Sequence, residues 1–267
     1  MRPAIINVMD GAARKAARSL VHDFGEVEQL QVSRKGPADF VSEADRRAEE
    51  ILRRELGKAR PEFSMLLEEA GTVGDTANTD RWIVDPLDGT TNFLNGIPHF
   101  AISIAHEEAG ELVAGMIYEP LRDECFWAVR GSGAYLNNHR LRVSARKDLG
   151  DAILATGVPF GDRPGKPETL AVLEPVMERT AGLRRFGAAS LDLAYVAAGR
   201  FDAFWEFGLA PWDVAAGILL IREAGGFVTE LDGGGDPLSG GTILAANDAL
   251  YDPVGRMLRE AIKAKTR

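Results

Sequence analysis

Cysteine is nearly absent from this chain, because Cys125 is the only one among 267 residues. A single cysteine excludes an intrachain disulfide and any metal centre built from several thiolates, and it fits a reducing compartment. Histidine is scarce as well, with four in the chain, and the stretch "HEEAG" (106–110) lacks the second histidine of a zinc-binding helix. If the chain binds a metal ion, oxygen atoms are the expected ligands.

Basic runs and long apolar runs are missing too. The chain has 31 Lys and Arg residues against 40 Asp and Glu, a net charge of −9, and no basic run interleaved with aromatic residues. A nucleic-acid backbone finds no electrostatic footprint here, so direct nucleic-acid binding is not expected. The segment 1–20 has apolar residues at helical spacing, but charged residues interrupt the apolar centre that a signal peptide or membrane span requires. We therefore expect a cytoplasmic protein that does not bind membranes.

Several common catalytic and phosphate-binding motifs are absent from the sequence. It has no GxxxxGK[ST] loop, no GxSxG elbow, and no GxGxxG followed by a suitable acid. The glycines 233–235 are interpreted as a flexible turn. Ser190 and Cys125 have no histidine close by in the sequence, which disfavours covalent catalysis.

The residues that are present are typical of a globular protein. Hydrophobic residues make up 45% of the chain, which is long enough to bury a large core. The stretch 4–23 has apolar side chains at helical spacing, and 98–130 alternates as the strands of an antiparallel meander do. Past about residue 150, helix and strand patterns alternate.

This change of pattern predicts two halves, 1–147 and 148–267, which pack tightly because no low-complexity linker separates them. A second helix is expected after "KGPADFV", with Ser42 capping its first turn and Gly57 ending it. The stretch 161–168 is the most loop-like part of the second half.

The stretch "WIVDPLDGTTNF" (82–93) carries two acids directly behind an apolar strand pattern. Pro86 favours an extended Asp85 and prevents a helix from continuing through it, so Asp85 is expected at a strand end. Asp88 and Gly89 then form a turn, and Thr90 can begin a short helix whose free amides point back toward the acids. This is a coherent phosphate site if metal ions lie between the two sets of negative charge. The alternative is an ordinary Asp-Gly turn in which Asp88 caps the next helix.

Two further apolar segments also end in acids. "FSMLLEEAG" places Glu68 behind a strand pattern, and "LAPWDVAAG" starts a helix with Asp213. Each has a simpler interpretation, Glu68 as a surface loop acid and Asp213 as an acid favoured by the helix dipole. Three apolar segments that end in carboxylates nevertheless indicate a site for magnesium or manganese.

Long segments of the chain resemble the inositol monophosphatase family, within the lithium-sensitive, magnesium-dependent sugar phosphatases. "WIVDPLDGTTNF" and "WDVAAGILLIREAGG" are similar to the two signature segments of the family, and the resemblance extends from about residue 4 to 262. It implies an α+β fold, a layered α-β-α-β-α sandwich of the type shared with fructose-1,6-bisphosphatase, with an antiparallel sheet in the first half and a mixed sheet in the second. It also implies a homodimer.

The resemblance implies two to three Mg²⁺ ions per subunit. Glu68, Asp85 and the carbonyl of Leu87 would bind one ion, Asp85, Asp88 and Asp213 a second, and Glu68 a weaker third. The family usually has glycine before its glutamate pair, where this chain has Leu67, so the resemblance identifies Glu68 but does not fix the geometry of its loop.

Catalytic roles follow from the same resemblance. Glu68 and Thr90 would orient the attacking water, with Glu68 assisting proton removal. The amides of Gly89 and Thr90 would hold phosphate oxygens, and Asp88 would lie near the leaving oxygen. No phosphoenzyme is expected.

The alcohol half of the substrate is assigned to the second half of the chain. Glu206 matches the acid that binds inositol hydroxyls, although it could instead be a solvated acid at a strand end. Gly187, Ala188 and Ala189 match the segment that lines the ring, although they could simply start a helix. Arg184 is a candidate substrate or dimer contact. Two residues match a mobile loop near the metals, Lys35 and Asp45.

The expected function is a magnesium-dependent phosphomonoesterase acting on myo-inositol 1-phosphate or a related polyol phosphate, inhibited by lithium. Fructose 1,6-bisphosphate, 3'-phosphoadenosine 5'-phosphate and histidinol phosphate are alternative substrates within the same fold. A regulatory, protein-binding role is the alternative from a different class.

Overall fold

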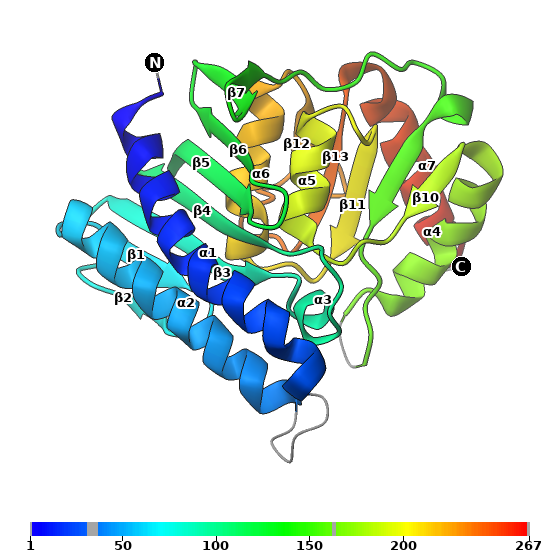
Figure 1. The fold of residues 1–267 in the computed structure, drawn as a ribbon. Helices are drawn as coiled ribbons and strands as arrows, with labels where there is room; N and C mark the ends of the chain where they lie inside the picture. Colours follow the sequence, from blue (N-terminus) through cyan, green and yellow to red (C-terminus); the bar gives the residue numbers. More distant parts are fainter. Residues whose placement is uncertain (1, 31–36, 162–163, 266–267) are drawn as a thin grey trace.

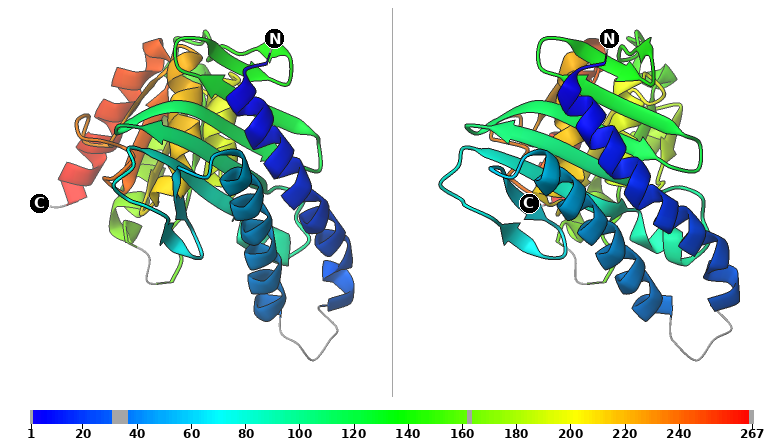
Figure 2. Two further views of the ribbon diagram at one scale, coloured as in Figure 1. Left: turned by 90° about the vertical axis from the view of Figure 1, so that its left-hand side faces the viewer. Right: turned by 60° about the vertical axis from the view of Figure 1, so that its left-hand side comes forward.

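The computed structural model describes residues 2–30, 37–161 and 164–265, and it has five layers (Figure 1). Helices α1 (Ala4–Leu30) and α2 (Pro37–Ala59) cover one face of an eight-stranded sheet. Helices α5 (Ala189–Ala197) and α6 (Pro211–Glu223) lie between this sheet and a five-stranded sheet. Figure 2 shows α7 on the side of the molecule away from α1 and α2. The expected α-β-α-β-α sandwich is confirmed.

The first sheet has the strand order β2-β1-β3-β4-β5-β6-β7-β8. The meander expected over 98–130 is confirmed, because β4, β5 and β6 pair antiparallel in sequence order. The sheet is not antiparallel throughout, since β1 runs parallel to β3. Its strands are β1 (Ser64–Leu67), β2 (Gly71–Val73), β3 (Asp80–Asp88), β4 (Ala101–Glu108), β5 (Glu111–Glu119), β6 (Glu124–Val129), β7 (Gly133–Leu136) and β8 (His139–Arg140).

The second sheet is mixed, as expected, with the order β10-β9-β11-β13-β12. Helices α4 and α7 pack against each other and contact this sheet from outside. The remaining elements are α3 (Thr90–Leu94), the 3-10 turn η1 (Leu149–Asp151), β9 (Ile153–Thr156), α4 (Lys166–Arg179), β10 (Gly182–Arg184), β11 (Ala203–Phe207), β12 (Phe227–Thr229), β13 (Thr242–Ala246) and α7 (Asp248–Lys265).

The middle layer explains why α5 and α6 are so apolar. Every residue of α5 is buried, and so is the stretch 214–221 of α6. A helix that is apolar all round is stable only where other elements cover every face, which two flanking sheets provide. One core cluster joins Ile83 and Ile117 of the first sheet to Leu193 and Ile218. Each sheet is drawn from one of the two expected halves, while the boundary near 147 stays a prediction.

Three local expectations differ from the structure. The first helix runs to Leu30 rather than to 23, and α2 begins at Pro37, so Ser42 lies inside it and Gly57 does not end it. The loop-like stretch 161–168 contains the start of α4, because a proline in the first helical turn removes only an amide that has no partner there. Lys35 lies outside the described residues. Among the described helices, none has both the length and the apolar character that a membrane crossing requires.

Candidate active site

A cavity of about 310 Å³ lies where the first sheet meets the amino-terminal regions of α5 and α6 and the end of β11. It is lined by most of the residues that the sequence assigned to a site. Ala188 is buried just behind Ala189, and Arg184 does not line the cavity. The expected residues that line it are Glu68, Asp85, Leu87, Asp88, Gly89, Thr90, Gly187, Ala189, Glu206 and Asp213.

Parallel pairing of β1 and β3 brings Glu68 beside Asp85. Leu67 is the register partner of Val84, so the next residue of each strand is an acid at the same sheet edge. The loop after Glu68 is held from α2, because Glu49 accepts hydrogen bonds from the amides of Glu69 at 2.9 Å and Ala70 at 3.1 Å. Leu67 is fully buried in the core beneath α1 and α2.

The turn that follows Asp85 is held by hydrogen bonds between its own side chains and backbone. The amide of Leu87 donates to Asp85 Oδ1 at 2.9 Å, and the Thr90 hydroxyl donates to the carbonyl of Leu87 at 3.0 Å. Contrary to expectation, Asp85 does not end the strand, because β3 continues to Asp88 through an irregularity in its pairing with β4. Pro86 lies inside this bulge, where its missing amide costs no ladder hydrogen bond.

Asp88 caps a helix that is distant in sequence. Its Oδ2 accepts the amide of Ser190 at 2.8 Å and also the Ser190 hydroxyl. The amides of Ala189 and Leu191 hydrogen-bond it as well, so the first turn of α5 surrounds the carboxylate. The simpler interpretation, a cap on the next helix, is wrong, because Gly89 occupies that position in α3 and no side chain caps it.

Asp213 lies in the first turn of α6, and its Oδ2 accepts the amide of Ala210 at 2.7 Å. Asp213 is therefore an acid at a helix amino terminus, where the helix dipole favours it, as the simpler interpretation stated. The same carboxylate also lines the cavity and raises the pKa of Asp85. The two roles are compatible because one carboxylate has two oxygens and about four acceptor sites.

Burial and mutual repulsion dominate the electrostatics of this cavity. Burial raises the pKa of Asp85 well above its usual range, and the charges of Glu68, Asp88 and Asp213 raise it further. Burial also raises the pKa of Glu68. The pKa of Asp88 is raised by burial as well, although its hydrogen bonds from α5 oppose the rise. So many carboxylates with raised pKa values indicate a site that is completed by a cation or by protons.

The wall opposite these acids carries Glu206, near the end of β11. Its carboxylate lies directly over Gly157, where an added Cβ would fall 1.8 Å from Oε1. Asn92 of α3 connects the segment before β4 to the segment before α5, because its Nδ2 donates to the carbonyls of His99 and Phe186, each at 2.8 Å.

Comparison with known proteins agrees with this geometry. The family model described as "Inositol monophosphatase family" matches residues 3–264. The chain belongs to the inositol monophosphatase family. An inositol-1-monophosphatase of Rhizobium meliloti is 55% identical over 264 residues, 99% of each chain. The Nus factor SuhB of Escherichia coli is 43% identical over 258 residues, 97% of each chain. The crystal structure of the extragenic suppressor protein suhB from Bartonella henselae has a TM-score of 0.89 at 56% identity, covering 97% of this chain and 99% of that one.

The donor set suits the metal dependence that is general in this family. The carboxylates and the Leu87 carbonyl supply only oxygen ligands, which Mg²⁺ prefers. Among the described residues, no group of three or more Asp, Glu, His or Cys side chains is already positioned to hold a metal ion by itself.

Sequence reasoning missed several members of the site. Ser190 and Glu49 hold Asp88 and the Glu68 loop, and Arg185 lines the cavity where Arg184 was expected. Asp192 is 1% exposed and lies within the electrostatic reach of Glu206. Only the repeated acids and apolar runs were visible in the sequence, whereas these four depend on packing between distant segments.

Asp45 lies inside helix α2 rather than in a loop as the resemblance implied, and it is within electrostatic reach of Glu68. It is buried, and its Oδ1 has no hydrogen-bond partner among the described residues. Burial raises the pKa of Asp45 to about 8, and the charges of Glu68, Glu69 and Glu49 contribute to the rise. Asp45 therefore extends the acidic field of the site toward α2.

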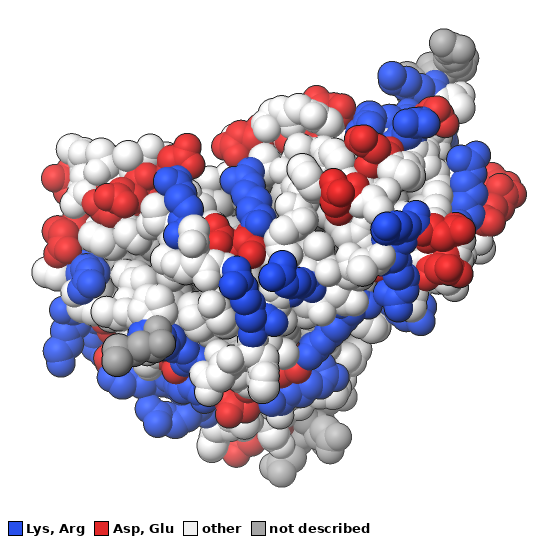
Figure 3. All heavy atoms as spheres, turned by 90° about the horizontal axis from the view of Figure 1, so that it is seen from above, with Lys and Arg blue, Asp and Glu red and all other residues white. Residues whose placement is uncertain are grey.

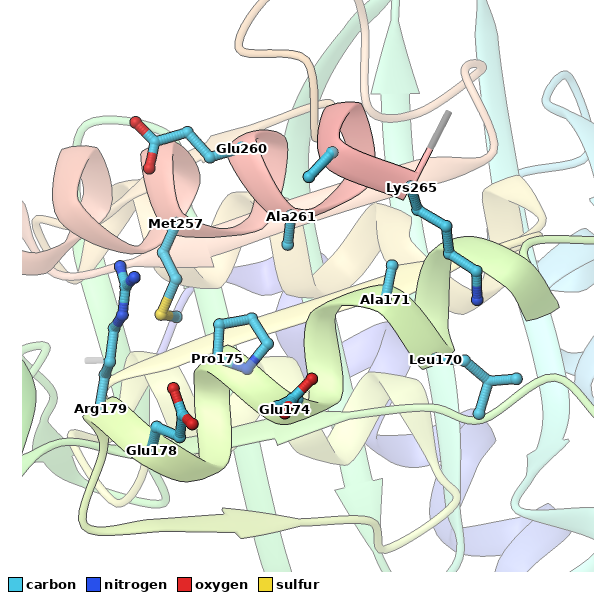
Figure 4. A pocket seen from close by; sticks show the side chains of 11 residues that line it. Leu170, Ala171, Glu174, Pro175, Glu178, Arg179, Met257, Glu260, Ala261 and Lys265 are labelled. Atoms are coloured by element: carbon cyan, nitrogen blue, oxygen red, sulfur yellow. The ribbon is translucent and has the colours of Figure 1, made fainter. Parts of the chain in front are cut away.

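A separate groove of about 560 Å³ lies between α4 and α7 (Figure 4). Met257, Pro175 and Ala261 lie between the two helices, and charged side chains surround them. None of the described residues that the sequence assigned to a site lines this groove, so it is not the candidate active site.

Proposed function

We propose that this protein is a magnesium-dependent phosphomonoesterase that hydrolyses myo-inositol 1-phosphate, or a related polyol phosphate, to the alcohol and inorganic phosphate. Its membership of a phosphatase family makes it an enzyme. The observation that carries the proposal is one cavity that combines Glu68, Asp85, Asp88 and Asp213 with Glu206 on the opposite wall. The names of the relatives at 53–55% identity support the same substrate.

Metal ligation follows the assignment made from the sequence. Glu68, Asp85 and the Leu87 carbonyl would hold one Mg²⁺, and Asp85, Asp88 and Asp213 a second. Glu68 would hold a weaker third. When bound, these ions would supply positive charge for the phosphate and an acidified water as nucleophile.

The protein's own groups then orient and move protons. Thr90 and Glu68 orient the attacking water, and Glu68 takes its proton, which its raised pKa favours. The amides of Gly89 and Thr90 hold phosphate oxygens, and Asp88, fixed by α5, lies near the leaving oxygen. Gly187 and Ala189, with Ala188 behind them, leave room for the alcohol, and Glu206 accepts its hydroxyls.

A phosphate-release assay tests the proposal. We expect turnover of myo-inositol 1-phosphate with Mg²⁺, loss of turnover with EDTA, and inhibition by Li⁺. Fructose 1,6-bisphosphate, 3'-phosphoadenosine 5'-phosphate and histidinol phosphate form the rest of the panel. No Mg²⁺-dependent turnover on any of these compounds would refute the enzymatic proposal.

We also propose a cytoplasmic homodimer without a nucleic-acid partner. Two large apolar side chains beside the cavity support a second copy, Ile97 at 47% and Phe186 at 39% exposed. On the face shown in Figure 3, basic and acidic side chains are interspersed, which disfavours a nucleic-acid backbone as ligand. Light scattering after size exclusion measures the oligomeric state.

A regulatory role is the second candidate, because relatives named Nus factor SuhB are 43–47% identical to this chain. The variants Asp88→Asn and Asp213→Asn separate it from catalysis. A cellular phenotype that survives complete loss of phosphatase activity assigns the important function to binding. A phenotype lost in both variants assigns it to catalysis.

A further inference from the structure

The wall of the cavity opposite the acid cluster contains one cation. Arg185 is the only Lys or Arg among the described residues that line the cavity, which also contains five acids. Glu206 lines the same cavity, and both Glu206 and Arg185 are electrostatic neighbours of the buried Asp192. The chemistry of this wall therefore combines one donor group with one acceptor group.

The guanidinium of Arg185 is held in place by its neighbours. A side chain at position 187 would begin 2.7 Å from Arg185 Nη1, so this nitrogen lies directly over Gly187. The guanidinium carbon also lies 5.2 Å from the ring centroid of Phe160, a cation–π arrangement. Phe160 is 66% exposed and Arg185 is exposed as well, so the pair is open to solvent.

Behind this wall lies Asp192, a buried carboxylate with no hydrogen-bond partner on either oxygen among the described residues. It is 1% exposed. Burial raises the pKa of Asp192, the charges of Glu206 and Asp88 raise it further, and Arg185 lowers it. Asp192 therefore lies within electrostatic reach of both Glu206 and Arg185.

We propose that Arg185 and Glu206 form a donor–acceptor pair that recognises two adjacent hydroxyls of the substrate alcohol, which makes Arg185 a specificity-determining residue. A guanidinium only donates hydrogen bonds and a carboxylate only accepts them, whereas each hydroxyl of a vicinal diol does both. The inference rests on the proposed phosphatase function and extends it to the alcohol half of the substrate.

This pair also determines which substrates are disfavoured. A second phosphate on this wall would be repelled by Glu206, and a cationic amine would be repelled by Arg185. The wall therefore suits a neutral polyol carrying one phosphate. Among the panel compounds, myo-inositol 1-phosphate has this character, while fructose 1,6-bisphosphate and histidinol phosphate do not.

The test compares Arg185→Gln with Arg184→Gln on two substrates at saturating Mg²⁺. Arg184 is the neighbouring exposed arginine outside the cavity, and its Nη1 donates to the carbonyl of Leu183 at 3.0 Å. For Arg185→Gln we expect the KM for myo-inositol 1-phosphate to rise about tenfold, the loss typical of one hydrogen bond to a charged group, with kcat little changed. The KM for p-nitrophenyl phosphate, which lacks hydroxyls, should stay within about twofold. Arg185→Lys should recover part of the loss.

Binding of free myo-inositol, followed by ligand-detected NMR, gives a second readout that does not need turnover. The wild-type protein and Arg184→Gln should bind the polyol, and Arg185→Gln should bind it about tenfold more weakly. An unchanged KM in Arg185→Gln, an equal rise for both substrates, an equal rise in Arg184→Gln, or no polyol binding by the wild-type protein overturns the inference. Failure of the proposed function looks different, because it removes Mg²⁺-dependent release from p-nitrophenyl phosphate as well.

Discussion

Asp85→Asn should stabilise the metal-free protein while it abolishes catalysis. Asp85 is 2% exposed, and three other carboxylates raise its pKa in addition to burial. Asparagine keeps the oxygen that accepts the Leu87 amide, so the turn survives while the charge is removed. Asp85→Asn therefore removes the repulsion between carboxylates without changing the backbone of the turn.

The size of the effect follows from Coulomb's law. Two like charges about 5 Å apart repel by about 3 kcal/mol at an effective dielectric constant of about 20. Because Glu68 and Asp85 also hydrogen-bond each other and the side chains relax, we expect a net gain of about 1–3 kcal/mol in the free energy of unfolding. For a protein of this size, that gain corresponds to a rise in Tm of about 2–5 °C.

The pH dependence has a definite sign. A carboxylate whose folded pKa is raised destabilises the folded state as pH rises above its unfolded value of about 4. The gain from Asp85→Asn should thus grow as pH rises above about 4 and shrink as pH falls toward about 4. Saturating Mg²⁺ reverses the order, because a ligand at about 100 times its Kd adds about 2.7 kcal/mol to the wild-type protein and little to the variant.

Thermal unfolding in EDTA and in Mg²⁺, at pH 5 and pH 8, measures these differences. Glu174→Gln is the matched control, an exposed acid on α4 that should show neither effect. A variant that is less stable than wild type in EDTA at pH 8 would refute the reasoning, because the acids would then not be repelling one another. Equal stabilisation of both proteins by Mg²⁺ would refute the assignment of Asp85 as a ligand.

Three further outcomes follow from the same geometry. Ser190→Ala removes the hydroxyl donor to Asp88 and should raise the pKa of Asp88 further. The Mg²⁺ concentration for half-maximal activity should therefore rise about tenfold, with a larger effect at lower pH, and an unchanged activation curve at pH 6 would contradict this. Gly157→Ala should displace Glu206 and raise KM for a polyol phosphate more than KM for p-nitrophenyl phosphate, and equal changes would contradict this. Asp192→Asn should raise the free energy of unfolding at pH 8 by about 1–3 kcal/mol, because burial raises the pKa of this carboxylate and the penalty of ionising it grows with pH. Denaturant unfolding measures this gain, which should be smaller at pH 5.

Features that depend on nearby residues were predictable from the sequence. The apolar strand, the proline and the Asp-Gly turn of 82–93 all lie within one short segment, and the structure assembles them as a turn beside a short helix. The apolar helix pattern after Asp213 likewise predicted a buried α6. In both cases local periodicity and turn chemistry agree with the tertiary fold.

Features that depend on contacts between distant segments were not predictable from the sequence. Arg184 and Arg185 are adjacent in sequence, and only the placement of β10 decides which of them lines the cavity. Capping of α5 by Asp88 joins positions 102 residues apart, and no local pattern records it. Helix α4 was missed because its prolines and weak periodicity look loop-like until the packing against α7 is known.

The four acids proposed as metal ligands, Glu68, Asp85, Asp88 and Asp213, are not compensated equally, and this difference connects the fold to the chemistry. Asp88 accepts amides from the first turn of α5, and Asp213 accepts an amide at the start of α6, so two helix amino termini offset two of the charges. Asp85 is buried at the centre and accepts one amide of its own turn, while Glu68 lies beside it through the parallel pairing of β1 and β3. The fold thus neutralises the rim of the cluster and leaves its centre most in need of positive charge. A cation that enters this site gains most at the Glu68–Asp85 edge, which is where the attacking water is assigned.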